Sequence, residues 1–345
     1  MNKSNKLQNK ISHLFLAGSD LAKREEEILR DVSNITGFIP EKLMDKSTWW
    51  TSKEIGAFRY EGQFKGKKAV LKIQGVKPAT SEIYMIDSFA KANKSNIIRP
   101  PVLYDSMPWD DKKRYEALIM EFINGKRIVS NLTNSKELER FFFFHQEYGK
   151  NCTTKPWLDK PKFNLSEEIK ENFSKWRLAS FKLYLAHPLR EDADKELIDD
   201  AVDLLQKEYQ GVGSQFQHGH FSTNDLSEIS ENNVVLLSNL YWSFRPPFYD
   251  LVFGYHWFMY KLAEIENLSP QDVDTQRVLW LSKINEFARS DEEKRLLSLA
   301  LLERAAAGLN LDALSIDIKN PISAYLIEET RKEIKRLLGL IKKVY

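Results

Sequence analysis

Large apolar and polar residues alternate along residues 58–64 (Phe-Arg-Tyr-Glu-Gly-Gln-Phe), which is the pattern of a half-buried β-strand. Residues 69–73 (Ala-Val-Leu-Lys-Ile) form a second apolar run, which Lys72 interrupts. The segment between them, Lys-Gly-Lys-Lys, is polar and contains a glycine, as turns do. The pattern therefore predicts a β-hairpin over residues 58–73.

After the hairpin, the spacing of apolar residues changes to that of a helix over residues 81–92. Residues 100–104 and 115–120 are again apolar and predict two more strands around a polar loop. Residues 54–122 are thus expected to form a β-rich block that contains one helix.

The N-terminal part of the chain is charged and has apolar residues at helical spacing within residues 19–33. We expect residues 1–50 to be a helical extension packed on the surface of the main body. The changes of pattern along the chain then predict a β-rich N-lobe at 51–123 and a helical C-lobe at 124–345.

From residue 135 onward the chain is predicted to be mostly helical, including helices at 166–186 and 322–343. The four consecutive phenylalanines at 141–144 cannot share one face of one element, so this helix is expected to be buried on several sides. One apolar run at 233–239 predicts a short strand that enters a loop.

Helix starts and ends are marked by capping residues. Ser269 followed by Pro270 predicts an N-cap with proline at the first helical position. Ser290 and Glu293 fit a capping box, and Gly308 predicts a helix end.

Composition narrows the class of protein. The chain has 345 residues with 51 Lys+Arg and 49 Asp+Glu, a formal net charge of +2, which argues against nucleic-acid binding through bulk positive charge. Cys152 is the only cysteine, so an internal disulfide framework and a cysteine-cluster zinc site are excluded. The apolar run at 14–17 is too short for a signal peptide, and no stretch approaches the roughly 18 apolar residues of a membrane span. We therefore expect a cytoplasmic protein without nucleic-acid or membrane partners; the oligomeric state stays open.

Lys72 is a candidate functional residue because it interrupts an apolar strand. A lysine in such a place is costly unless its ammonium group reaches an anion, and Glu82 on the next helix is the nearest candidate. Kinases use a pair of this kind to hold nucleotide phosphates. The alternative is an edge-strand lysine in solvent, which alternation along a strand also allows.

Four further features follow in a fixed order. Residues 118–125 form an apolar strand that ends in a short polar segment with glycine, a pattern typical of a hinge between lobes. His218 and Gly219 follow a long helical stretch, 233–239 leads into a polar turn, and 245–251 leads into a helix. Two lobes of different composition suggest a nucleotide site in a cleft between them.

In this order and spacing, about residues 50–345 resemble the aminoglycoside phosphotransferase and choline kinase-like family, a branch of the protein-kinase-like fold. The resemblance implies an α+β, two-lobed fold with a small β-rich N-lobe and a larger, mostly helical C-lobe. It also implies ATP or GTP and Mg²⁺ as cofactors, and a small-molecule ligand that the variable helical lobe would bind.

The family's nucleotide-binding residues map onto the first lobe. The resemblance implies that Lys72 contacts phosphate and that Glu82 holds Lys72. It further implies that the hinge residues Met120, Glu121 and Phe122 flank the base.

The family's catalytic loop reads His-Gly-Asp, with an Asn five residues after the Asp. In this chain it falls on His218-Gly219-His220 and then Asp225. His220 thus stands where the family has the aspartate that orients and accepts the proton of the substrate hydroxyl. A neutral imidazole can act as a base near pH 7 but lacks the fixed negative charge.

The metal-binding aspartate of the family falls on Ser238 or Asn239, and the alignment leaves both open. Both are neutral and are weaker ligands for a hard cation than a carboxylate, so Mg²⁺ binding is expected to be weakened, with Asp225 as a remaining ligand. The later Pro-x-x-Asp-Leu segment matches residues 247–251. The phosphate-covering loop is poor, because Gly56 is its only glycine.

These departures predict a kinase-like protein that is catalytically impaired, or pseudokinase-like, because His220 and Ser238 or Asn239 replace the expected aspartates. The first alternative is an active ATP- or GTP-dependent phosphotransferase acting on a small-molecule hydroxyl, with His220 and Asp225 taking over the base and metal duties. The second alternative is a non-catalytic binding or scaffold protein.

Other interpretations of the same residues are weaker. His218 and His220 with Asp225 suggest a metal site, but no third histidine lies close in the sequence. In the family the first histidine is structural, so His218 is expected to be so too.

Aromatic clusters at Trp49-Trp50 and at residues 255–260 suggest a ligand cage, although core packing explains the second cluster better. His145 is expected to be a core or boundary histidine, and Cys152 to be inert.

Overall fold

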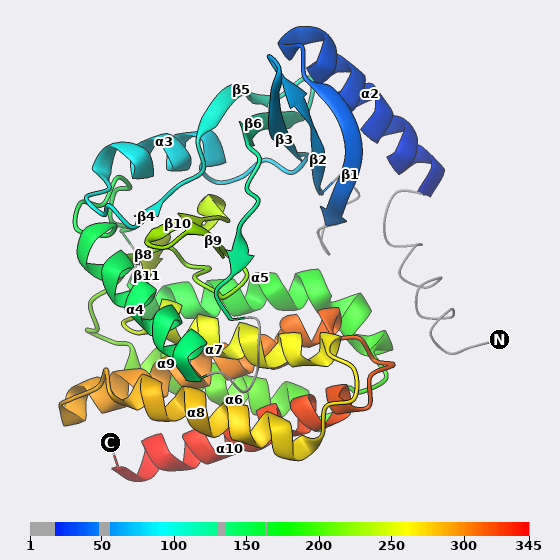
Figure 1. The fold of residues 1–345 in the computed structure, drawn as a ribbon. Helices are drawn as coiled ribbons and strands as arrows, with labels where there is room; N and C mark the ends of the chain where they lie inside the picture. The colour runs from blue at the N-terminus through cyan, green and yellow to red at the C-terminus, as the bar shows by residue number, and fades with distance from the viewer. Residues whose placement is uncertain (1–17, 48–55, 130–134, 163, 345) are drawn as a thin grey trace. The chain divides into compact units, whose positions relative to one another are not determined.

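The computed structural model describes residues 18–47, 56–129, 135–162 and 164–344 (Figure 1). The chain divides into two compact units by its internal contacts. The first unit is Met1–Lys126 with Ser227–Leu240, and the second is Arg127–Leu226 with Tyr241–Tyr345. By this division, residues 227–240, which the sequence pattern assigned to the helical lobe, belong to the first unit.

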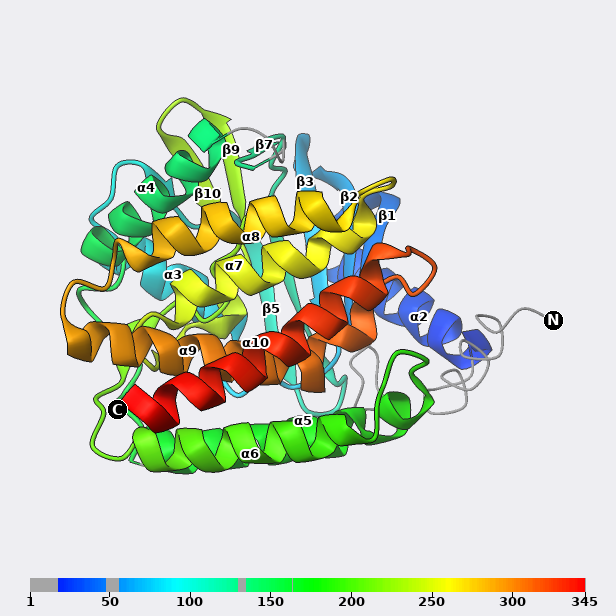
Figure 2. The ribbon, with the colours of Figure 1, turned by 90° about the horizontal axis from the view of Figure 1, so that it is seen from below.

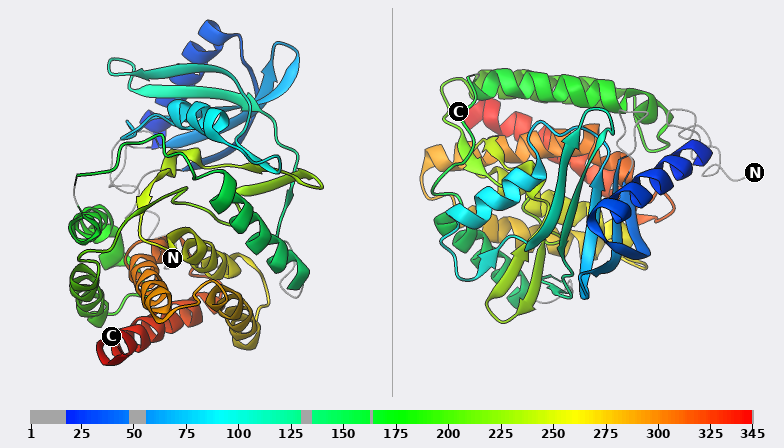
Figure 3. Two further views of the ribbon diagram at one scale, coloured as in Figure 1. Left: turned by 90° about the vertical axis from the view of Figure 1, so that its left-hand side faces the viewer. Right: turned by 90° about the horizontal axis from the view of Figure 1, so that it is seen from above.

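The first unit is built on a five-stranded antiparallel sheet with the strand order β1-β2-β3-β6-β5. Its strands and helices are β1 (Ile39–Ser47), β2 (Ala57–Phe64), β3 (Lys67–Gln74), β5 (Leu103–Asp110), β6 (Tyr115–Glu121), α2 (Gly18–Thr36) and α3 (Glu82–Ala92). The predicted hairpin is β2–β3, and its turn places Lys65 and Gly66 at positive φ. The right-hand view of Figure 3 shows this sheet with α2 beside β1.

The two faces of this sheet carry different cores. On one face, Ile28 and Val32 of α2 pack against buried strand residues that include Leu71 and Ile73. On the other face, Ile86 of α3 packs against Leu118 and Met120. Because side chains alternate along a strand, Lys72 lies between Leu71 and Ile73 but points to the α3 face.

Residues 39–47 differ from the prediction, since they form strand β1 rather than a helix. The described side chains of β1 after Pro40 are exposed, so this edge strand carries no apolar alternation from which it could be predicted. Backbone pairing with β2, from Ile39 opposite Gln63 to Ser47 opposite Ala57, determines its conformation. The helix before it is confirmed, and its buried Ile28 makes it part of the core of the first unit.

A second sheet has the order β4-β10-β9-β7 and lies mostly in the first unit. Its strands are β4 (Ile98–Arg99), β7 (Lys126–Arg127), β9 (Leu226–Ser230) and β10 (Asn233–Leu236). The strand predicted at 233–239 is therefore confirmed in its first four residues. It pairs in parallel with β4, and the 3₁₀-helix η1 (Asn239–Tyr241) follows.

The second unit is mainly helical and contains α4 (Ser135–Asn151), α5 (Leu165–Ala186), α6 (Ala193–Glu208), α7 (Tyr249–Lys261), α8 (Pro270–Asn285), α9 (Asp291–Asn310) and α10 (Ile322–Val344). Two 3₁₀-helices, η2 (Leu262–Glu264) and η3 (Asp312–Ser315), and the small antiparallel pair β8 (Gln215–Gln217) and β11 (Ser243–Arg245) complete it. Helix α9 is central, because α5, α6, α7 and α10 all pack against it (Figure 2). Of the helices within the described ranges, none is both long enough and apolar enough to cross a membrane.

The predicted helix starts are confirmed, since Ser269 and Ser290 both form capping boxes. Gly308 does not end its helix, because α9 continues to Asn310. Glycine occupies this position for another reason, because a Cβ there would lie 2.8 Å from the ring of Tyr260. Of the four phenylalanines in α4, three are buried and Phe143 is 47% exposed.

Candidate functional site

The first unit contains the predicted ion pair between Lys72 of β3 and Glu82 of α3. The Nζ atom of Lys72 donates to Oε2 of Glu82, and the two side chains are 14% and 4% exposed. Ser81 is the N-cap of α3, and its side chain accepts a hydrogen bond from the Ile83 N–H, which fixes the start of the helix. A nearly buried ammonium group is thus held at the first turn of α3, oriented by one carboxylate.

A second buried carboxylate, Glu116 of β6, lies beside this pair and was not predicted. Its Oε2 accepts a hydrogen bond of 2.8 Å from the Ser81 hydroxyl, and its Oε1 accepts from the Glu82 N–H at 3.4 Å. Burial raises the pKa of Glu116. The sequence signal was a glutamate in alternation with Leu118 and Met120, the residues that face α3.

The predicted hinge residues lie at the end of β6. Met120 is buried, and the carboxylate of Glu121 accepts a 3.1 Å hydrogen bond from Arg99 and a 2.7 Å bond from the Val102 N–H. The ring of Phe122 lies 3.7 Å from the ammonium group of Lys68. The Glu121 N–H also donates to the Val102 carbonyl at 2.9 Å, so both the side chain and the N–H of Glu121 are engaged within the first unit.

In the second unit, Asp250 of α7 holds the turn at His218-Gly219. Its Oδ2 accepts from the His218 N–H at 2.9 Å and from the Tyr148 hydroxyl at 2.8 Å, and its Oδ1 accepts from the Gly219 N–H at 2.8 Å. Burial raises the pKa of Asp250 to about 6. Gly219 has φ +76°, and a Cβ there would lie 2.4 Å from the carbonyl oxygen of Tyr241, so the turn requires glycine.

His220, the next residue, is bound to Asp225. Its Nδ1 lies 2.9 Å from Oδ2 of Asp225, and the hydroxyl of Ser222 donates to the same oxygen. Burial alone would raise the pKa of Asp225, but the charge of His220 and the hydrogen bonds from His220 and Ser222 outweigh it, so the pKa lies below its usual value. Oδ2 of Asp225 is thus engaged by two neighbours in its own loop.

Three aromatic rings surround the imidazole of His220. Tyr241 stacks on it at 4.6 Å between ring centroids, and Phe253 and Trp257 of α7 lie at 4.5 and 5.5 Å. The aromatic residues of α7 are therefore mainly core packing, as predicted, with Phe253 and Trp257 placed against His220.

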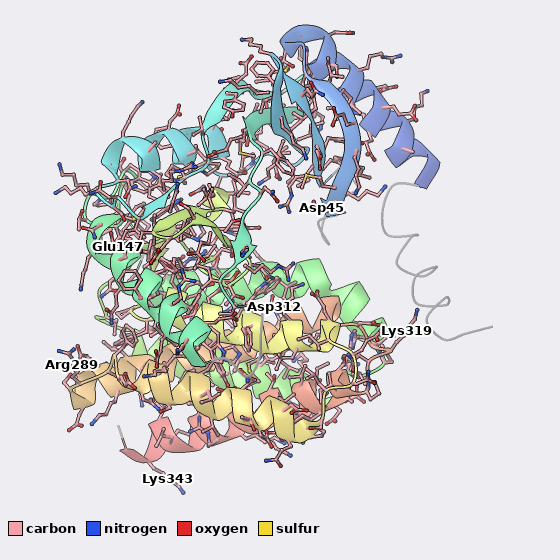
Figure 4. The ribbon with its side chains drawn as sticks, viewed as in Figure 1. Asp45, Glu147, Arg289, Asp312, Lys319 and Lys343 are labelled. Atoms are coloured by element: carbon pink, nitrogen blue, oxygen red, sulfur yellow. The ribbon has the colours of Figure 1, made fainter. Side chains whose placement is uncertain are left out.

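Arg304 of α9 packs against the ring of Phe253, one of the rings that contact His220. Its guanidinium group lies 4.7 Å from the Phe253 ring centroid and donates to Oδ2 of Asp312 at 2.7 Å. Asp312, labelled in Figure 4, lies in η3 directly after α9. The ring that contacts His220 is thus fixed by a charged residue of the central helix.

The predicted metal-ligand position lies after β10 in the first unit. Asn239 is fully buried, and its amide Nδ2 donates to the Leu236 carbonyl at 2.9 Å. Ser238 has φ +60°, which is unusual for a residue other than glycine. In the ranges described, no group of three or more His, Cys, Asp or Glu side chains is placed to hold a metal ion.

The remaining candidate residues are either buried in the core or lie outside the residues that the structure describes. His218 is buried, with its ring edge-on to Trp242. Burial lowers the pKa of His145 to about 4 and raises that of Cys152 to about 12. Trp49-Trp50 and the loop preceding Gly56 lie outside the described residues.

Comparison with known proteins identifies the fold. No protein-family model and no curated protein sequence matches the chain. Among solved structures, the amicoumacin kinase hAmiN in complex with AMP-PNP, Ca²⁺ and Ami is 11% identical, with a TM-score of 0.59 over 92% of this chain and 96% of that one. Aminoglycoside phosphotransferase APH(4)-Ia is 11% identical, with a TM-score of 0.56 over 92% and 98%. Spectinomycin phosphotransferase APH(9)-Ia, in complex with ADP and spectinomycin, is 12% identical, with a TM-score of 0.51 over 90% and 98%.

The β-rich and helical units together define a protein-kinase-like fold. Within that class, the chain has the fold of the aminoglycoside phosphotransferases, as its sequence pattern predicted. At 10–12% identity, this likeness shows the fold alone.

Proposed function

We propose that this protein binds a nucleoside triphosphate without efficient phosphoryl transfer, as a pseudokinase related to small-molecule phosphotransferases. The observation that carries the proposal is the bonding of Asp225. In the family pattern this position contributes to the metal site, but here its carboxylate is bonded to His220 and Ser222.

The donor set does not fit a Mg²⁺ site. Hard cations are bound by several oxygen ligands, among which carboxylates are preferred. Of the predicted ligand positions only Asp225 has a carboxylate, and its Oδ2 already accepts hydrogen bonds from His220 and Ser222. Ser238 and Asn239 are neutral, so the set supplies one negative charge where a hard cation prefers several carboxylate oxygens. No catalytic step is therefore assigned to a metal.

The nucleotide-binding part of the proposal depends on Lys72. Its ammonium group is oriented by Glu82, and both side chains are largely withdrawn from water, where a charge–phosphate contact is strong. Lys72 would contact the phosphates, and Met120, Glu121 and Phe122 would flank the base. ADP and AMP-PNP are bound in the solved relatives.

The second candidate function is an active phosphotransferase, and the His220–Asp225 pair favours it. With Nδ1 held 2.9 Å from the carboxylate, Nε2 is the ring nitrogen left to accept a proton from a substrate hydroxyl. The low pKa of Asp225 keeps this carboxylate ionised, so it would stabilise the imidazolium formed.

Thermal unfolding of the full chain with ATP or GTP, with and without Mg²⁺, tests both candidate functions. We expect the nucleotide to stabilise the protein without Mg²⁺, by about 2.7 kcal/mol when its concentration is 100 times its dissociation constant. Lys72→Met should abolish this stabilisation, and Lys67→Met, an exposed change on the same strand, should not. Asp225→Asn should leave the nucleotide effect unchanged.

Two outcomes would overturn the pseudokinase proposal. Absence of stabilisation by either nucleotide would point to a scaffold protein. Mg²⁺-dependent stabilisation, together with ATP turnover that His220→Ala removes, would instead establish the active phosphotransferase.

A further inference from the structure

Glu116 of β6 is a buried carboxylate that the proposed function does not use. It is fully buried. In the register of β3 and β6, Lys72 lies opposite Leu118 and Gln74 lies opposite Glu116. Residues directly opposite each other share a face of the sheet, so Glu116 and Lys72 lie on the same face, one cross-strand pair apart. A buried carboxylate in this place needs partners that offset the cost of its burial.

Both oxygens of Glu116 are bonded to the start of α3. Oε2 accepts from the Ser81 hydroxyl at 2.8 Å, and Oε1 accepts from the Glu82 N–H at 3.4 Å. The Ser81 hydroxyl in turn accepts from the Ile83 N–H at 3.2 Å. The N–H groups of a first helical turn have no acceptor within the helix and form the positive end of its dipole, so a carboxylate is favourable there. Glu116 thus joins the first turn of α3 to β6.

The contact further along α3 is of another kind. Ile86 packs on Leu118 and Met120, and this contact is apolar. Apolar packing is non-directional, whereas hydrogen bonds fix how a helix is rotated and how far it is shifted along its axis. Because Glu82 is the first residue of α3, the position of its carboxylate beside Lys72 depends on this first turn.

We propose that Glu116 is a positioning residue, which anchors the first turn of α3 to β6 and thereby holds Glu82 against Lys72. The anchor is a property of the first unit itself. Its effect on ligand binding rests on the proposed function, in which Lys72 contacts the nucleotide phosphates. Without the anchor, Glu82 would no longer fix the direction of the Lys72 ammonium group, and nucleotide affinity would fall.

Two replacements of similar size separate bonding from packing. In Glu116→Gln, the amide oxygen can accept from the Glu82 N–H, and the NH₂ group can donate to the Ser81 hydroxyl, which has two lone pairs. In Glu116→Leu both hydrogen bonds are lost, although leucine suits a face that also carries Leu118 and Met120. If Glu116 only filled space, leucine would replace it at least as well as glutamine.

Amide hydrogen exchange of the full chain without nucleotide, followed by NMR, tests the anchor. We expect the N–H groups of Glu82 and Ile83 to exchange at least about tenfold faster in Glu116→Leu than in the parent, because their acceptors are lost or released. In Glu116→Gln the rates should stay within about threefold of the parent. The Asn93 N–H, which bonds to the Phe89 carbonyl at the other end of α3, should be unchanged in both variants and so reports on the helix as a whole.

Titration calorimetry with ATP in the absence of Mg²⁺ tests the consequence for binding. Glu116→Leu should bind ATP at least about tenfold more weakly than the parent, and Glu116→Gln should stay within about threefold. Ile28→Ala is the control for lost stability, because Ile28 of α2 packs on the opposite face of the sheet. At a temperature where it is folded, this variant should bind ATP as the parent does.

Three results would overturn the proposal. These are unchanged exchange of Glu82 and Ile83 in Glu116→Leu, an ATP affinity of Glu116→Leu equal to that of the parent, or equal losses in Glu116→Leu and Glu116→Gln. The last would show that the charge of Glu116 matters and not its bonding. If the parent bound neither ATP nor GTP, the proposed function would fail instead, and the exchange rates of the first turn would still decide whether Glu116 anchors α3.

Discussion

The buried carboxylate of Glu333 makes stability depend on pH, and Glu333→Gln should remove that dependence. Burial raises the pKa of Glu333 from 4.5 to about 7, and its side chain is 12% exposed. The folded state then binds more protons than the unfolded state between these values, so stability falls as pH rises from about 4.5 to about 7. At 1.36 kcal/mol per pKa unit, ionised Glu333 costs about 3 kcal/mol above pH 7.

Glutamine has the same shape and stays neutral, so the variant should avoid this cost. The free energy of unfolding of Glu333→Gln relative to the parent should rise by about 3 kcal/mol between pH 4.5 and pH 8. Urea denaturation followed by tryptophan fluorescence at several pH values measures the difference. Comparing the two proteins at each pH cancels the contributions of the other buried acids, Glu303 and Asp250, whose pKa values burial also raises.

Glu328→Gln on the same helix is the control, because its side chain is 44% exposed and water solvates its charge. Its effect on stability should be small and the same at every pH. If the difference between Glu333→Gln and the parent were also independent of pH, the idea that Glu333 is held as a buried, unsatisfied carboxylate would be refuted.

Two further substitutions test the fold around the candidate site. Gly219 has φ +76°, and Gly219→Ala would place a Cβ 2.4 Å from the Tyr241 carbonyl oxygen, so thermal unfolding should show a loss of stability of about 2 kcal/mol or more. The control is Gly213→Ala, whose Cβ would meet nothing within 4 Å and which should change stability by less than about 0.5 kcal/mol. Ile28→Ala should cost about 2–5 kcal/mol in urea denaturation, whereas Ile35→Ala, at a 55% exposed position on the same helix, should be nearly neutral; equal effects would contradict a core role for α2.

Local pattern was sufficient for the central hairpin and for α3, and it indicated Glu82 as the candidate partner of Lys72. Side-chain alternation places Lys72 on the α3 face, and the N-cap at Ser81 starts the helix one residue before Glu82. The edge strand β1 could not be predicted in this way, because its described side chains after Pro40 are exposed and its conformation depends on hydrogen bonds to β2. The prediction that Gly308 ends a helix was wrong for a related reason. Glycine is needed there because the ring of Tyr260, which is distant in the sequence, leaves no room for a side chain.

By itself, the sequence determined the central hairpin and most of the helices, and it marked Lys72 as a strand lysine with Glu82 as its candidate partner. Only the tertiary structure decided what the acidic residues of the second unit do. Asp250 accepts hydrogen bonds from residues 31 and 32 positions earlier, and Asp225 is committed to His220. The same holds for Glu333, whose unsatisfied oxygen depends on how α7, α8 and α10 pack around it. Periodicity reports which face of an element is buried, whereas the bonding of a buried charge is set by groups that come together only when the chain folds.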